Sequence, residues 1–197
     1  GSPTVLGNKR VCVGSNDKTL YFFDELGNKL SSFKTGGWIM HSKPMVQSDS
    51  VVVVGSYDNN IYSVSSSGRK LWSFETNGKI HASPQQFSNG NIICGSFDKN
   101  IYVLNKDGQI VNYVETGNKV ISSAAIINGK YAVVGSYDGY LYVIDAEGKV
   151  LDTIPIGGKV FSSPISLDDG SIFCATMNGR ALFIRMADYS APSSQKL

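Results

Sequence analysis

The fold of this chain is decided by a short stretch that it repeats, Gly95-Ser96-Phe97-Asp98. The same Gly-Ser-x-Asp tetrad stands at residues 14–17, 55–58 and 135–138, and a degenerate fifth copy reads Ala175-Thr176-Met177-Asn178. Consecutive copies are 41, 40, 40 and 40 residues apart. A period near 40 residues built from short β segments is typical of propeller blades, each with about four strands.

One period, followed from residue 91 to residue 123, predicts a series of strands joined by tight turns. The apolar run 91–94 and the β-forming run 101–104 predict two strands, and the carboxylate of Asp98 caps the turn between them. Residues 110–115 form the predicted outer strand, and residues 119–123 the innermost strand of the next blade. A Ser-Pro pair, or a variant of it, closes each innermost strand: Lys43-Pro44, Ser83-Pro84, Ser123-Ala124 and Ser163-Pro164.

Two further features recur in every complete period. A glycine marks the hairpin before the outer strand, where a positive φ is expected. These glycines are Gly27, Gly68, Gly108 and Gly148. A tyrosine, interpreted as a filler between blades, recurs as Tyr21, Tyr62, Tyr102 and Tyr142, with Leu182 in the fifth copy. No stretch shows helical periodicity over ten residues, so the predicted fold class is all-β.

Composition and charge limit the classes of protein to which the chain can belong. The 197 residues are 42% hydrophobic and 11% aromatic, which suffices for a sizeable core, and the continuous repeat leaves no room for a linker. A formal charge of +2 without basic runs argues against nucleic acid as a partner. Apolar runs such as residues 51–54 are too short to span a membrane.

The three cysteines, Cys12, Cys94 and Cys174, lie within apolar strands and are predicted to be buried free thiols. Together with the lack of a visible signal peptide at the start, this favours a cytoplasmic location. Secreted proteins also carry buried thiols, so the compartment stays open.

The tetrad and its surroundings resemble the PQQ-like, or quinoprotein-type, repeat family of β-propellers. Residues 133–145 match the first part of the family pattern, Val-x-Val-Gly-Ser-x-Asp-Gly-x-Leu-Tyr-x-Leu-Asp, almost residue for residue. Residues 68–76 and 157–164 match the two parts that follow, and the resemblance runs from about residue 3 to residue 185. WD40 repeats fit worse, because the chain has no Gly-His or Trp-Asp dipeptide.

The resemblance implies a propeller without the quinone. Members that bind the cofactor carry two adjacent cysteines and a calcium site of carboxylates and amides, whereas no two cysteines are adjacent here. The outer-strand tryptophan of the family survives only as Trp72. Family members without quinone serve as scaffolds, and we expect neither a cofactor nor a metal.

Five repeats are expected, at about residues 3–43, 44–83, 84–123, 124–163 and 164–187, followed by a polar tail at 188–197. The fifth repeat stops after its third strand, at residues 181–185. Two arrangements are open: a five-bladed ring with an imperfect last blade, which is favoured, or a piece of a seven- or eight-bladed ring. A piece would expose strand edges and associate with copies of itself.

Two sets of polar residues have a plain structural interpretation. The tetrad aspartates, Asp17, Asp58, Asp98 and Asp138, lie one per blade and cannot converge on one cation, so turn capping is predicted. His41 and His81 stand three residues before Pro44 and Pro84 on adjacent blades. Without a third ligand they are better read as polar lining of the central channel than as a zinc or acid–base site.

A third set forms the candidate binding rim. Lysines recur just after the turn from outer to innermost strand, and aromatic residues recur in the hairpins that emerge on the same face. These residues are Lys79, Lys119, Lys159, Tyr57, Phe97 and Tyr137, and His41 and His81 lie beside them. Such a rim could hold an anionic peptide or ligand through charge and ring contacts. The competing interpretation is solvated lysines and aromatics wedged between blades.

The leading functional hypothesis is a non-catalytic scaffold that binds a protein partner through one loop face. A small-ligand propeller with lectin-like sites is the alternative, and a fragment of a quinoprotein dehydrogenase is the third. Nucleophile and phosphate-binding motifs are absent from the sequence. Self-association is expected if the ring is open.

Overall fold

The computed structural model describes residues 1–167 and 169–185, which fold into five antiparallel sheets and one 3-10 helix, η1 (Gly7–Lys9). The first sheet contains β1 (Thr4–Val5), β2 (Val11–Gly14), β3 (Thr19–Phe23) and β4 (Lys29–Lys34). The second contains β5 (Met45–Ser48), β6 (Val51–Gly55), β7 (Asn60–Ser65) and β8 (Lys70–Glu75). The third contains β9 (Gln85–Gln86), β10 (Ile92–Gly95), β11 (Asn100–Leu104) and β12 (Ile110–Glu115).

The fourth sheet contains β13 (Ala125–Ile127), β14 (Tyr131–Gly135), β15 (Tyr140–Asp145) and β16 (Val150–Pro155). The fifth has three strands, β17 (Ile165–Ser166), β18 (Ile172–Ala175) and β19 (Ala181–Ile184). Each sheet is a meander in which consecutive strands pair. The predicted all-β propeller architecture is therefore confirmed. The polar tail expected at 188–197 lies outside the described residues.

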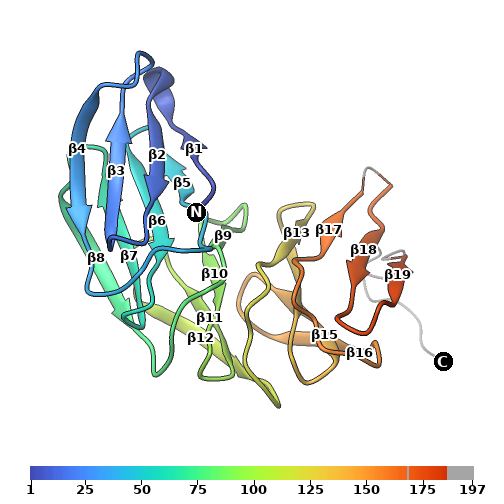
Figure 1. Cartoon of the computed structure of the whole chain (residues 1–197). Helices are drawn as coiled ribbons and strands as arrows, with labels where there is room; N and C mark the ends of the chain where they lie inside the picture. Colours follow the sequence, from blue (N-terminus) through green and yellow to red (C-terminus); the bar gives the residue numbers. More distant parts are fainter. Residues whose placement is uncertain (168, 186–197) are drawn as a thin grey trace.

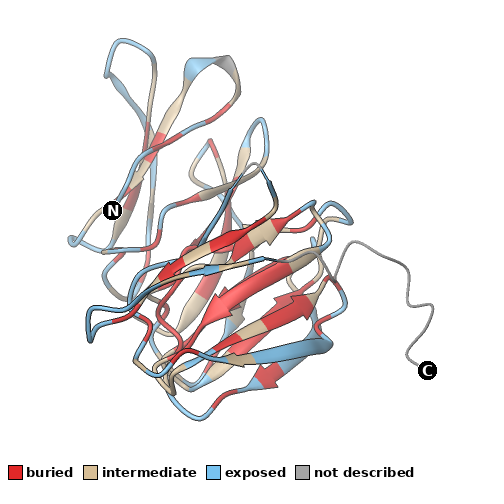
Figure 2. Cartoon of the chain, turned by 90° about the vertical axis from the view of Figure 1, so that its right-hand side faces the viewer, coloured by how far each residue is buried: buried red, intermediate tan, exposed pale blue. Residues whose placement is uncertain are grey.

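The innermost strands lie side by side in chain order, β1 with β5, β5 with β9, β9 with β13 and β13 with β17. The five sheets therefore follow one another along an arc, with the first sheet at one end and the fifth at the other (Figure 1). Apolar side chains fill the spaces between neighbouring sheets. Between the third and fourth sheets, for example, Ile93, Ile101 and Val114 pack with Val134 and Ile144. Figure 2 shows buried residues along the strands and exposed residues in the loops.

The innermost strands are not where the sequence places them. Residues 119–123 form no strand, and the innermost strand of the fourth sheet is β13, which begins two residues later. The reason is that the backbone of 119–123 bonds elsewhere: Val120 N donates to the Ser96 carbonyl at 2.9 Å, and Ser123 N donates to Ser163 Oγ at 2.9 Å. The Ser-Pro pair thus precedes the innermost strand instead of closing it. The first sheet has its own innermost strand, β1.

The tetrad glycine is required by a close approach between blades. A Cβ on Gly95 would lie 2.3 Å from Val120 Cγ1, and one on Gly135 would lie 2.3 Å from Val160 Cγ1. The fifth copy has Ala175 at this position, in the last of the five described sheets. The glycine is therefore needed wherever another blade follows.

The tetrad aspartate ties two blades together. Asp98 Oδ1 accepts a hydrogen bond from Asn100 N at 3.0 Å, which is the predicted turn cap. Asp98 Oδ2 accepts from Tyr102 OH and, across the blade junction, from Asn77 N, both at 2.8 Å. Asp58 and Asp138 make the same three kinds of bond. Turn capping by these residues is confirmed.

The recurrent tyrosine lies at the same junctions. The Tyr62 ring meets Phe33 of the preceding sheet edge-on at a centroid distance of 5.4 Å, and Tyr102 meets Phe74 at 5.3 Å. Its predicted role as a filler between blades is confirmed.

The arc is open. Val5 in the first sheet is 69% exposed and Phe183 in the fifth is 71% exposed, whereas a closed ring would bury such side chains between these two sheets. The favoured five-bladed closure is therefore wrong for the described residues. The five sheets sweep only part of a turn (Figure 1).

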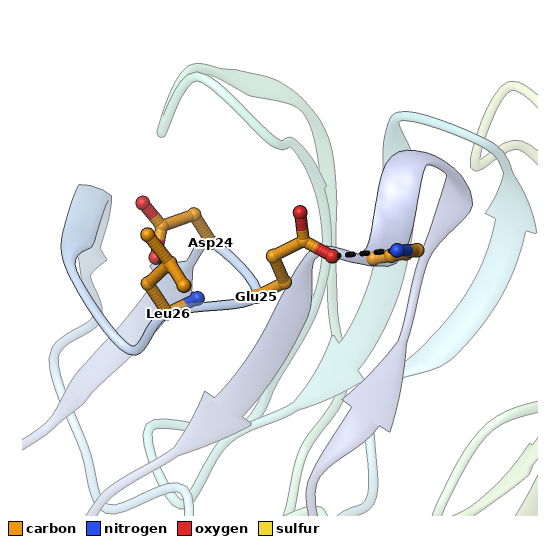
Figure 3. Close-up of polar contacts among 4 residues, drawn as sticks. Asp24, Glu25 and Leu26 are labelled. Carbon is orange, nitrogen blue, oxygen red and sulfur yellow. Dashed lines mark hydrogen bonds and ion pairs between the residues drawn. The ribbon is translucent and has the colours of Figure 1, made fainter.

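At the opposite end from the tetrads, the loop after β3 is held by local polar contacts. Asp24 Oδ1 accepts from Leu26 N at 2.9 Å, and Glu25 Oε2 lies 2.8 Å from Lys9 Nζ (Figure 3). Both charged side chains are largely exposed, so that this ion pair contributes at most about 1 kcal/mol to stability.

Gly95→Ala is expected to lower the free energy of unfolding by about 1–3 kcal/mol, because the new methyl group overlaps Val120. Urea denaturation measures the change. Ala175→Gly in the fifth copy is the matched control and should have a smaller effect. Equal losses for the two variants would contradict the role assigned to the tetrad glycine.

Candidate functional site

Two kinds of loop meet on one face of the propeller. They are the hairpins that follow β6, β10 and β14 and the turns that lead from one blade to the next. A backbone hydrogen bond joins them at each junction. Phe97 N donates to the Lys79 carbonyl at 3.0 Å, and Tyr137 N donates to the Lys119 carbonyl at 3.1 Å. The aromatic residue of each tetrad is thereby placed beside the turn that carries the lysine.

The lysine side chains lie over the aromatic rings. Lys119 Nζ is 5.0 Å from the Phe97 ring centroid and 4.6 Å from that of Tyr137. Lys79 Nζ lies 5.5 Å from the Tyr57 centroid, and Lys159 Nζ lies 5.9 Å from that of Tyr137. The six lysine and aromatic residues singled out in the sequence are therefore assembled into one alternating row, which we call the rim.

The two histidines stack on each other beside the rim. Their ring centroids are 4.1 Å apart, and the His81 ring lies 6.0 Å from that of Phe97. Tyr57 Oη lies 2.8 Å from His81 Nδ1. The structure thus brings all eight predicted residues together.

His81 is held neutral at physiological pH. Burial, followed by the charges of His41 and Lys119, lowers its pKa from 6.5 to about 4. Burial also raises the pKa of Tyr57. Within residues 1–167 and 169–185, no group of three His, Cys, Asp or Glu side chains could hold a metal ion.

Two exposed aromatic residues of this site were not anticipated from the sequence. The Trp38 ring lies 6.2 Å from that of Tyr57 and is 48% exposed, and the Phe161 ring lies 5.9 Å from that of His81 and is 50% exposed. Superposing the repeats would have found Trp38, because it stands where the next repeats carry Lys79, Lys119 and Lys159. A search for recurring residues passes over such departures.

The electrostatics of the rim favour anions. Among the described residues, Lys79, Lys119 and Lys159 take part in no ion pair. The tetrad carboxylates Asp58, Asp98 and Asp138 are occupied by their turn, tyrosine and cross-blade bonds. The rim therefore combines unpaired cations with accessible aromatic surface.

The three cysteines of the chain lie outside the rim. The thiols of the chain lie in the sheets, and burial raises the pKa of Cys12 to about 12 and also raises that of Cys94. A buried thiol with a raised pKa is a poor nucleophile. The His81 ring nitrogen that faces Tyr57 is already engaged.

A hollow of about 580 Å³ lies between the second and third sheets, on the face opposite to the rim. Trp72 Nε1 and Gln47 Nε2 both donate to the Lys106 carbonyl, at 3.0 and 2.8 Å. A Cβ on Gly108 would lie 2.5 Å from Trp72 Cδ2, so the indole packs closely on that glycine. Trp72 therefore serves the junction between blades.

The lowered pKa of His81 predicts a pH dependence of stability. As pH falls from about 6.5 to about 4, the unfolded chain takes up a proton that the folded chain does not, so the free energy of unfolding decreases. In His81→Gln this component should disappear. Urea denaturation between pH 7 and pH 4 compares the two proteins, and identical pH slopes would contradict the assignment.

Comparison with known proteins agrees with this architecture. BamB from Moraxella catarrhalis, in its crystal structure, superposes with a TM-score of 0.77 at 15% sequence identity, over 90% of this chain and 59% of that one. The chain thus spans less than two thirds of that protein. No curated protein matches the sequence. In the described part of the chain, no helix has the length and apolar character needed to cross a membrane.

A family model described as outer membrane protein assembly factor BamB, built on the PQQ-like repeat, matches residues 16–190. This match covers most of the sequence, including all five tetrad copies apart from the first two residues of the first. The chain therefore belongs to this family of PQQ-like repeat propellers.

Proposed function

We propose that the chain is a non-catalytic scaffold that binds a protein partner through the rim. The observation that carries the proposal is the row of unpaired lysines lying over aromatic rings on one loop face. The description of the family as an assembly factor agrees with a protein-interaction role in general.

The rim is suited to recognition because it is held by the rigid part of the fold. Its lysines and rings are anchored by backbone bonds between blades, and Asp58 and Asp138 fix the turns beneath them. A preorganised surface loses little conformational entropy on binding. Lysine and aromatic side chains together suit a partner that presents acidic groups beside apolar ones.

The other hypotheses have less support from the geometry. The hollow at Trp72 has its indole and amide donors already bonded within the protein, which leaves few free groups for a sugar. A quinoprotein enzyme would need the vicinal cysteine pair that the sequence lacks. The scaffold proposal needs only the unpaired lysines and the half-buried rings of the rim.

Lys79→Glu combined with Lys119→Glu should weaken partner binding by about tenfold or more at low salt, because opposite charge is lost and like charge introduced. Partners are captured by crosslinking with the wild-type chain, identified by mass spectrometry and tested in purified form. The melting temperature should change little.

Lys106→Glu combined with Lys149→Glu is the matched control, since both lysines are exposed in hairpin loops at the opposite end. It produces the same change in net charge away from the rim. If both double variants bind the partner equally well, the rim is not the binding surface.

A further inference from the structure

Of the four equivalent positions at the turns between blades, three carry the rim lysines and one does not. Trp38 takes the position that Lys79, Lys119 and Lys159 hold in the following repeats. Its backbone still makes the hydrogen bond that the lysines make in the other repeats, since the Trp38 carbonyl accepts from Tyr57 N at 2.9 Å. The indole is therefore not required by the repeat, and yet a side chain of this size is 48% exposed.

Trp38 borders a hollow of about 310 Å³ at the junction of the first and second blades. The hollow is lined by Lys18, Gly36, Gly37, Trp38, Tyr57 and Lys79. The two rings stand 6.2 Å apart and are tilted by 32°, which leaves aromatic surface open on one side. A space of this size holds one or two amino-acid side chains.

The two charged side chains that line the hollow are both lysines. Lys18 and Lys79 line it, and among the described residues neither takes part in an ion pair. The neighbouring carboxylate of Asp58 is occupied by Gly36 N, Asn60 N and Tyr62 OH. An anionic group entering the hollow would therefore meet two lysines and no carboxylate among the lining residues.

Resting on the proposed function, we infer that this hollow is the anchor point for the partner and takes an apolar or aromatic side chain flanked by acidic residues on an extended peptide. The apolar side chain contacts Trp38 and Tyr57, and the acidic residues pair with Lys18 and Lys79. Tryptophan and tyrosine are enriched among the residues that dominate binding energy at interfaces. The other blade junctions have lysine in place of Trp38 and therefore lack the indole.

The indole N–H signals of an ¹⁵N-labelled protein test this directly, because the chain contains two tryptophans. Trp72 Nε1 is bonded to the Lys106 carbonyl at the opposite end and serves as the internal reference. Three blocked Gly-Ser peptides are titrated, which differ only in a central Glu-Phe-Glu, Glu-Ala-Glu or Lys-Phe-Lys. We expect the Glu-Phe-Glu peptide to shift the Trp38 signal in a saturable manner and to leave the Trp72 signal in place.

The other two peptides should bind at least about tenfold more weakly, since each lacks one of the two contacts. Trp38→Lys is the matched variant: it introduces the residue that the other repeats carry and should therefore fold, which its melting temperature checks. In this variant, shifts of the Tyr57 and Lys79 amides on addition of Glu-Phe-Glu should be lost. Equal affinity for the three peptides, unchanged binding by the variant, or no shift of Trp38 with any peptide would overturn the inference.

The inference and the proposed function fail separately. If a purified partner depends on Lys79 and Lys119 but binds Trp38→Lys as tightly as the wild type, the rim stands and the anchor is wrong. If neither set of changes affects the partner, both are wrong.

Discussion

The structure depends on the cross-blade hydrogen bond that the tetrad carboxylate accepts. Asp98 caps its own turn, holds Tyr102 and receives Asn77 N from the preceding blade, so one side chain fixes a hairpin and the junction at once. The glycine three residues before it lets the next segment pack against the sheet. In the fifth copy Asn178 keeps the link with the opposite polarity, because its Nδ2 donates to the Gly157 carbonyl at 3.0 Å. The hydrogen bond across the blade junction therefore does not require a charged side chain at this position.

These junctions also explain where the rim lies. The bonds that join a hairpin to the preceding turn bring a ring from one blade and a lysine from the next into contact. A second row follows the axis, where Lys43 N, Ser83 N and Ser123 N each donate to the serine 40 residues ahead, at 2.8–2.9 Å. Both rows are products of the repeat. The proposed binding surface therefore arises from the same contacts that stabilise the fold, and substitution of its exposed side chains leaves those contacts in place.

Local chemistry made much of this predictable from the sequence. The 40-residue period predicted the blades, and the turn residues predicted the hairpins. The alternation of strand direction correctly placed Lys119 and Tyr137 on one face. The predictions that were wrong concern features that depend on contacts between distant segments. Residues 119–123 have a strand-like composition, yet their backbone bonds to Ser96 and Ser163 instead of to a strand. The angle between sheets, which leaves Phe183 exposed, is set by side-chain packing and has no signature in the spacing of the repeats.

A repeat protein offers its own test of which residues are free to serve function. Recurring residues such as Asp98 and Tyr102 are explained by the junctions, and their chemistry is used within the fold. A residue that replaces the recurring type while its backbone keeps the shared bond has no such explanation. Trp38 satisfies both conditions, whereas Trp72, equally rare among its counterparts, is bonded to Lys106 and packed on Gly108. Of the two tryptophans, the one that the repeat does not require is the one that lies beside the rim.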